Sequence, residues 1–106
     1  MPSRLETLEA LCARAPADPF PYYCLAQEYR SQKRAGDALA AFGRLRDRFP
    51  EYVPQYLMAA QLCVEEDNPR EARAWLTQGI AAARAKRDAH AQGELEALLQ
   101  ATPEPP

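Results

Sequence analysis

The chain is poor in the residues from which enzymes and metal proteins build their sites. It has one histidine, four glycines and three cysteines among 106 residues. With a single histidine, acid–base catalysis would depend mostly on paired carboxylates. The sequence also lacks a glycine-rich phosphate loop and a serine-centred nucleophile motif. We therefore predict that the chain is not an enzyme and carries no cofactor.

Metal and redox motifs are also missing. The cysteines, Cys12, Cys24 and Cys63, fit neither a paired zinc-ligand motif nor a CxxC redox motif. Their odd number argues against a secreted disulfide scaffold, so we expect three small apolar side chains in a reducing compartment. His90 and Glu94 lie four residues apart, a spacing that could bring both to a metal ion. Two ligands make a weak site, and a surface hydrogen bond is the better interpretation.

The sequence has no excess of positive charge and no long apolar run. Its formal net charge is −2, whereas nucleic-acid-binding domains usually carry a basic excess. A short arginine run, Arg44, Arg46 and Arg48, is expected on a solvated surface at a helix C-terminus, where cations are stabilised. No segment approaches the roughly 18 apolar residues of a membrane span, and no charged leader precedes an apolar segment. We predict a cytoplasmic protein that binds neither nucleic acid nor membrane.

What the sequence does contain is helical periodicity, almost from end to end, with no alternation typical of strands. Proline, glycine, aspartate and asparagine mark the ends of six predicted helices. Their expected ranges are 3–14, 19–32, 35–48, 54–66, 69–86 and 88–101. Ser3 with Glu6, and Asn68 with Glu71, have the spacing of capping boxes. Because the connections are short, consecutive helices are expected to form antiparallel hairpins.

Two stretches of the chain match when one is shifted by 34 residues. The shift pairs Tyr22, Leu25, Ala26, Tyr29, Ala38, Phe42 and Leu45 with Tyr56, Ala59, Ala60, Cys63, Ala72, Leu76 and Gly79. A fixed period of roughly 20 to 50 residues is the signature of a stacked repeat architecture. Each repeat would be a helical hairpin that buries its apolar face against its neighbours, and the paired alanines would let the helices approach closely.

This pattern resembles the tetratricopeptide repeat family. The first unit matches the family pattern at Tyr22, Leu25, Ala26, Tyr29, Ala38, Phe42, Leu45 and Pro50. The second unit is weaker, because Ala59, Cys63 and Leu76 replace larger residues and Arg84 stands where proline would close the unit. Without that proline we expect a long fifth helix. The resemblance implies an all-α fold, a right-handed α-α superhelix of about six antiparallel helices.

We predict one domain over residues 1–101. It would contain an N-terminal helix or half repeat at 3–16, repeats at 19–52 and 53–86, and a capping helix at 88–101. Leu95, Leu98 and Leu99 follow one side of that last helix, and the other side is polar, as a helix that caps a repeat array requires. The proline-rich residues 102–106 are expected to form a disordered tail.

The resemblance also implies a binding face. Family members typically bind an extended peptide or a partner helix in a concave groove lined by the first helix of each hairpin. The matching groove positions here are Tyr23, Gln27, Arg30, Leu57, Gln61 and Val64. The residues expected to pack the repeats are Tyr22, Leu25, Ala26, Tyr29, Ala38, Phe42, Tyr56, Ala60, Ala72 and Leu76. The alternative for the groove positions is a solvated surface, or one packed against the sixth helix.

One subclass of the family clamps the C-terminal carboxylate of chaperone tails with basic residues. Here Tyr23, Leu57 and Asp88 stand where cations would be needed, so this ligand is not expected.

The leading hypothesis is a non-catalytic scaffold that binds an unknown protein or peptide. The alternative is a self-associating unit that forms a homodimer. The acidic cluster Glu65, Glu66 and Asp67 is interpreted as a solvated turn at a helix end.

Overall fold

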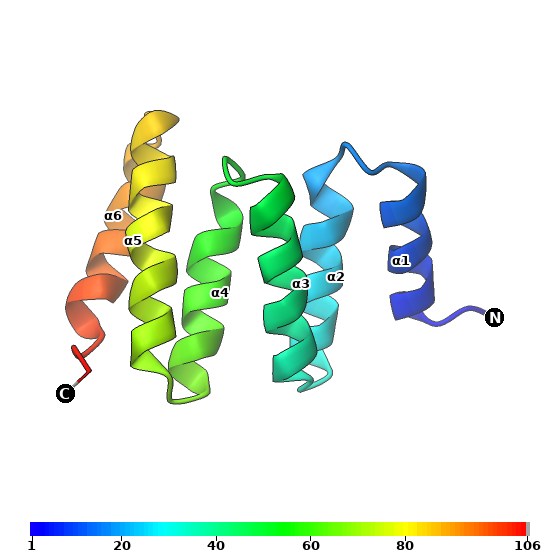
Figure 1. Ribbon diagram of the computed structural model, residues 1–106, viewed down its shortest axis with the longest axis horizontal. Coiled ribbons are helices and arrows are strands. Elements are labelled where there is room, and N and C mark those ends of the chain that lie inside the picture. Colours follow the sequence, from blue (N-terminus) through cyan, green and yellow to red (C-terminus); the bar gives the residue numbers. More distant parts are fainter. Residues whose placement is uncertain (106) are drawn as a thin grey trace. The chain divides into compact units, whose positions relative to one another are not determined.

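The computed structural model describes residues 1–105 and contains six α-helices and no strand in that range (Figure 1). The helices are α1 (Arg4–Arg14), α2 (Pro19–Ser31), α3 (Ala35–Arg48), α4 (Pro54–Glu65), α5 (Pro69–Ala85) and α6 (Ala89–Ala101). The prediction of an all-α fold is confirmed, and each predicted helix end lies within one residue of the observed one. As expected from the missing proline, α5 is the longest helix, with 17 residues.

The helix starts follow the cap residues read from the sequence. Ser3 Oγ accepts a hydrogen bond from the Glu6 N–H at 3.1 Å, and Asn68 Oδ1 accepts one from the Glu71 N–H at 3.3 Å. Asp18 and Asp88 cap α2 and α6 in the same way. Each such cap satisfies a backbone donor that the helix leaves unpaired, and it stabilises the helix by about 1 kcal/mol.

Three helix ends share a feature that the sequence did not predict. Lys33, Asp67 and Arg87, which follow α2, α4 and α5, have φ values of 60°, 57° and 55°. The next residue in each case, Arg34, Asn68 or Asp88, donates its N–H to the carbonyl of Tyr29, Cys63 or Ala83 at 2.8–2.9 Å. This is the hydrogen bond of a Schellman motif, which satisfies a carbonyl of the last helical turn. The three donors, Arg34, Asn68 and Asp88, are also the N-caps of α3, α5 and α6. One turn therefore ends a helix and begins the next.

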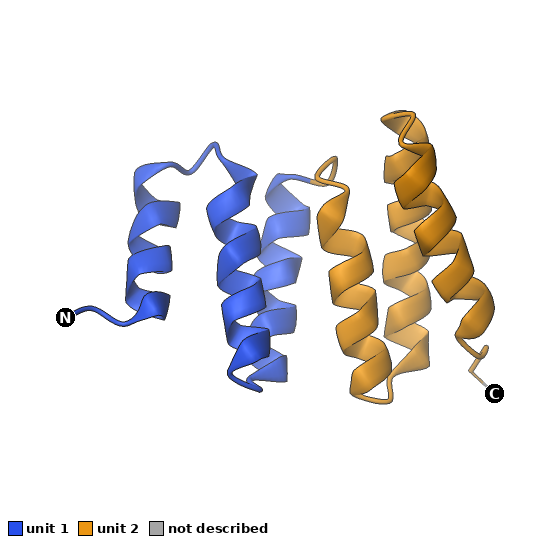
Figure 2. Ribbon diagram, turned by 180° about the vertical axis from the view of Figure 1, so that it is seen from behind, with its two compact units in different colours: residues 1–49 blue, residues 50–106 orange. Residues whose placement is uncertain are grey.

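The contacts within the chain divide it into two compact units (Figure 2). Unit 1 comprises residues 1–49, and unit 2 begins at residue 50. The predicted single domain over 1–101 stays a prediction, with its four subdivisions.

In unit 1, α2 packs between α1 and α3. An ion pair between Arg4 and Glu28, with 2.7 Å between Nε and Oε1, links α1 to α2. The core of this unit is formed by apolar side chains from all three helices: Leu8, Cys12, Tyr22, Leu25, Ala26, Ala38, Ala41, Phe42 and Leu45.

In unit 2, α5 packs against both α4 and α6, and α4 also contacts α6. The helices approach closely at Gly79 of α5. A Cβ atom added there would lie 2.5 Å from Tyr56 Cβ and 3.1 Å from Leu95 Cδ2. The largest buried side chains of this unit include Tyr56, Leu62, Trp75, Leu76, Ile80 and Leu95.

Nine of the ten residues expected to pack the repeats are buried, and the tenth, Tyr29, is half-buried. The Arg34 guanidinium carbon lies 4.8 Å from the centroid of the Tyr29 ring. Cation–π contacts of this kind stabilise by roughly 0.5–1 kcal/mol at exposed sites. Tyr29 thus keeps a partner for its ring at a half-buried position.

The expected disorder of residues 102–106 does not hold for Thr102, which is 4% exposed. Its Oγ1 donates to the Leu98 carbonyl at 2.7 Å, and its own carbonyl accepts a hydrogen bond from Arg73 Nη1 at 2.9 Å. Arg73 also forms an ion pair with Glu104. The last carbonyls of α6 need partners, and the guanidinium of α5 supplies them. Pro106, the last residue of the predicted tail, lies outside the described residues.

Candidate interaction surfaces

The predicted groove residues of unit 1 form what we call the α2 surface: Tyr23, Gln27 and Arg30. All three are half-buried. The Tyr23 ring meets Phe42 edge-on, with 6.4 Å between centroids, so its position is fixed by the core. Gln27 Nε2 donates to Tyr23 Oη at 3.4 Å. Burial raises the pKa of Tyr23 above its usual value, against the opposite effect of the Gln27 hydrogen bond, so the phenol stays neutral and can donate.

Gln27 also has a buried acceptor. Its Oε1 is inaccessible to solvent and accepts no hydrogen bond from the described residues. A buried polar atom without a partner costs about 1–3 kcal/mol.

The predicted groove residues of unit 2 form the α4 surface: Leu57, Gln61 and Val64. Leu57 and Gln61 are half-buried, and Val64 is 44% exposed. The sequence left open whether the sixth helix covers these positions. In the structure α6 contacts α4 and approaches Val64, but it leaves nearly half of that side chain open.

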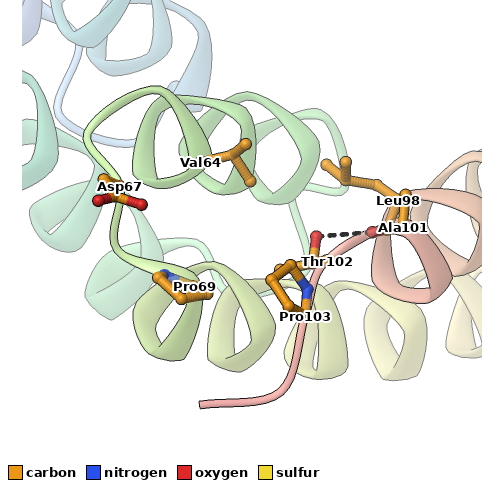
Figure 3. Close-up of a pocket in the computed structure, with 7 residues that line it drawn as sticks. All are labelled: Val64, Asp67, Pro69, Leu98, Ala101, Thr102 and Pro103. Atoms are coloured by element: carbon orange, nitrogen blue, oxygen red, sulfur yellow. Dashed lines mark hydrogen bonds between the residues drawn. The ribbon is translucent and has the colours of Figure 1, made fainter. Parts of the chain in front are cut away.

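Between α4 and α6 lies a pocket of about 240 Å³ within unit 2. It is lined by Val64, Asp67, Pro69, Leu98, Ala101, Thr102 and Pro103. Figure 3 shows Val64 of α4 and Leu98 of α6 on one side of the pocket, with Pro69 and Pro103 on the other side. Leu98 follows Val64 by 34 residues, so the repeat offset continues into α6.

One wall of the pocket depends on Arg73. Its Nη1 donates to the carbonyls of Leu99 and Thr102, at 3.4 and 2.9 Å. Its Nη2 lies 3.4 Å from Glu104 Oε1. These contacts hold Thr102 and Pro103 against α5, and they occupy the guanidinium.

The charge around the pocket is mainly negative. Asp67 lines it, and Glu65 and Glu66 precede Asp67 on the same exposed turn, as the sequence predicted for this cluster. The last residues of α4 and α6 lie at this end of the unit, and helix C-termini carry partial negative charge. Pro69, the first residue of α5, also lines the pocket, so the N-terminus of α5 contributes partial positive charge there, and the exposed Arg70 follows it.

A family model described as tetratricopeptide repeat matches residues 29–99. The chain belongs to the tetratricopeptide repeat family. No protein with a curated description matches it. Members of the family are in general protein–protein interaction scaffolds without catalytic activity, and they bind proteins or peptides.

Solved structures agree with this membership. A tetratricopeptide repeat domain protein from Salinibacter ruber, determined in solution, is 33% identical, with a TM-score of 0.76 over 82% of this chain and 88% of that chain. A crystal structure of such a protein from Salinibacter ruber is 34% identical, with a TM-score of 0.72 over 78% and 93%. A protein from Bordetella parapertussis has a TM-score of 0.78 over 96% and 89%, and at 22% identity it shows the fold alone.

Within this tetratricopeptide repeat chain, sequence reasoning missed the pocket between α4 and α6. The signal for Leu98 was present, since applying the 34-residue offset once more from Val64 reaches it. No such signal existed for Thr102 and Pro103, which fall in the segment expected to be a disordered tail. Their places depend on Arg73, which is 29 residues away from Thr102.

The remaining sequence candidates lie on exposed helix surfaces. His90 Nε2 is 3.3 Å from Glu94 Oε1, and both side chains are at least half exposed. No group of three or more His, Cys, Asp or Glu residues suited to a metal ion occurs among residues 1–105. In the arginine run, the Arg48 guanidinium lies 5.5 Å from the Tyr22 ring centroid, a contact within the fold.

The cysteines are free thiols, with Cys12 and Cys63 buried and Cys24 half-buried. Burial raises the pKa of all three, and that of Cys63 reaches about 11. No helix in the described part of the chain is both long and apolar enough to span a membrane.

Proposed function

We propose that this protein is a non-catalytic scaffold that binds an extended peptide or a helix of a partner protein through the α2 surface and the α4 surface. One observation carries the proposal. All six side chains of the two surfaces keep exposed area, although their helices bury the residues that pack the repeats. Each surface is therefore presented by a helix whose other side is fixed in a core.

The chemistry of these side chains suits a peptide. Gln27 and Gln61 each offer an amide that can donate to a peptide carbonyl and accept from a peptide N–H. Tyr23 and Arg30 add donors, and tyrosine and arginine are enriched among the residues that dominate binding energies at interfaces. Leu57 and Val64 supply apolar contact.

Because the side chains stand on packed helices, binding requires little ordering of the scaffold itself. The ordering cost then falls mainly on the peptide. We expect moderate affinity, concentrated in a few contacts.

The test is affinity capture from a lysate of the source organism, followed by mass spectrometry. The variant replaces Gln27, Arg30 and Gln61 with alanine and keeps Tyr23, whose ring packs on Phe42. A matched control replaces exposed residues of the same types, Gln32, Arg44 and Gln100. We expect the first variant to lose the captured proteins and the control to retain them, with both folded by circular dichroism. The same captured proteins with wild type and with the first variant would overturn the proposal.

A second candidate function is self-association. Two helices of unit 1 each expose a large apolar side chain: Leu11 of α1 at 40% and Phe20 of α2 at 58%. Apolar area of this kind is often covered in homodimers. Light scattering over a range of concentrations tests this function. A concentration-dependent dimer that is lost in Phe20→Ser supports it, and a monomer at all concentrations excludes it.

A further inference from the structure

The pocket between α4 and α6 is suited to side chains rather than to a whole small molecule. Its volume is about 240 Å³, below the roughly 300–1,000 Å³ of typical small-molecule sites. Val64, Pro69, Leu98, Ala101 and Pro103 give it mainly apolar walls. An aliphatic side chain that enters would cover exposed area of Val64 and Leu98, which favours binding in proportion to the apolar area removed from water.

Negative charge at the edge of the pocket favours a positively charged residue next to the bound aliphatic side chain. Asp67 lines the pocket, and Glu65 and Glu66 extend the acidic surface along the turn. The C-terminal end of α4 adds partial negative charge beside Asp67, whereas Arg73 binds carbonyls at the end of α6 and the N-terminus of α5 adds partial positive charge at Pro69, so the selection depends on the Asp67 carboxylate. Of the nearby cations, Arg73 is held by two carbonyls and Glu104, and Arg70 sits in the first turn of α5 beside Glu71. The pocket is therefore complementary to an apolar group with a cation next to it.

We propose that this pocket binds a leucine-like side chain of a partner peptide that carries lysine or arginine at the adjacent position. The inference rests on the proposed function, because the occupant is a segment of a bound protein. It shares Val64 with the α4 surface and adds two residues that lie outside the predicted groove positions: Leu98, which with Val64 would hold an aliphatic anchor, and Asp67, which would select a basic neighbour.

The test uses three synthetic, end-blocked peptides: Gly-Ser-Leu-Lys-Ser-Gly, the same peptide with glutamate for lysine, and the same peptide with alanine for leucine. Each is titrated into the full isotope-labelled chain, and methyl and amide NMR shifts are followed. We expect the leucine–lysine peptide to shift the methyl signals of Val64 and Leu98. The other two should bind several-fold more weakly.

Two substitutions and one control make the test specific. Val64→Ser removes apolar contact from an exposed position, and we expect about a tenfold loss of affinity for the leucine–lysine peptide. Asp67→Asn should lower affinity about two- to fivefold and reduce its dependence on salt. Leu11→Ser alters a side chain of similar exposure, 40% against 44%, in unit 1 and should leave binding unchanged.

The outcomes separate this inference from the proposed function. No shift at Val64 and Leu98 at millimolar peptide overturns the inference, as does equal binding of all three peptides. If shifts appear instead at Tyr23 and Gln27, the inference fails and the proposed function stands. In a further outcome, the variant at Gln27, Arg30 and Gln61 still captures partners and the pocket still binds the leucine–lysine peptide. The proposed binding through the α2 and α4 surfaces is then wrong, and the pocket remains a binding site.

Discussion

At the scale of single residues, Gly79 is the glycine with the least room for a side chain. A side chain there would meet Tyr56 on α4 and Leu95 on α6 at once. We predict that Gly79→Ala destabilises the protein by about 1–3 kcal/mol, because a methyl group forces packed helices apart. Urea unfolding followed by circular dichroism measures the change.

Gly43 is the matched control. It also lies inside a helix, α3, but a Cβ atom there would meet nothing within 4 Å. Gly43→Ala should therefore stabilise by about 0.5–1 kcal/mol, since alanine loses less backbone entropy than glycine in a helix. Equal effects of the two substitutions would contradict the close approach at Gly79.

The buried thiol of Cys63 predicts a pH dependence. Burial, with a smaller effect of Glu71, raises the pKa of Cys63 from 9.0 to about 11. In the unfolded chain this thiol loses its proton near pH 9, so the folded state is relatively disfavoured as pH rises further. The stability that Cys63 contributes is thus fully present below pH 9 and is lost as the pH rises through about 11.

Denaturant unfolding at pH values between 8 and 11, for the wild type and Cys63→Ala, checks this dependence. The variant should lose less stability over the same range. In a chain that retains only Cys63, the rate of alkylation by a thiol reagent should rise up to about pH 11. Rapid alkylation at pH 8 under native conditions would be inconsistent with the raised pKa.

At the scale of elements, the left-handed residue of each Schellman turn reduces the stability of the fold. Lys33 adopts a left-handed conformation that costs a residue with a side chain roughly 1–2 kcal/mol, and glycine avoids most of it. We predict that Lys33→Gly stabilises by about 0.5–1 kcal/mol after the added entropy of the unfolded chain is counted. Gln32, the preceding residue, has a φ of −87°, so Gln32→Gly should destabilise instead. Thermal unfolding of both variants measures the difference, and a stabilised Gln32→Gly would refute the explanation.

The helices themselves were readable from the sequence because their signals are local. The caps at Ser3 and Asn68 act over three residues, and the proline and aspartate stops lie next to the helix ends they mark. The left-handed turns were not readable, because lysine, aspartate and arginine stand where glycine usually signals them. Each of these turns connects two helices that pack against each other, a contact that lies outside the local sequence.

The candidate site was readable only in part, for the same reason. The six groove positions follow from the resemblance to the tetratricopeptide repeat family, and they stay predictions. The wall of the pocket could not, because it forms when Arg73 of α5 meets Thr102 at the end of α6. Nothing in the segment 102–106 by itself signals that contact.

At the scale of the whole molecule, the division into two units predicts which helices a core substitution destabilises. Leu25 in unit 1 and Leu95 in unit 2 are each 1% exposed. Replacing either with valine removes a methylene from a core and costs about 0.8 kcal/mol or more. Because most contacts lie within a unit, Leu95→Val should speed hydrogen exchange in α4–α6 more than in α1–α3, and Leu25→Val should do the reverse. Equal acceleration throughout by both variants would show a single cooperative block.

The shared turns also bear on how quickly the chain folds. Since Arg34, Asn68 and Asp88 each close one helix and open the next, the helices they join meet after a very short loop. Their contacts therefore connect residues close in sequence, and chains with such local topology fold in roughly microseconds to milliseconds. The two helices of each hairpin can therefore pack together before contacts between distant parts of the chain form. This shortens the time for which their apolar faces are exposed during synthesis.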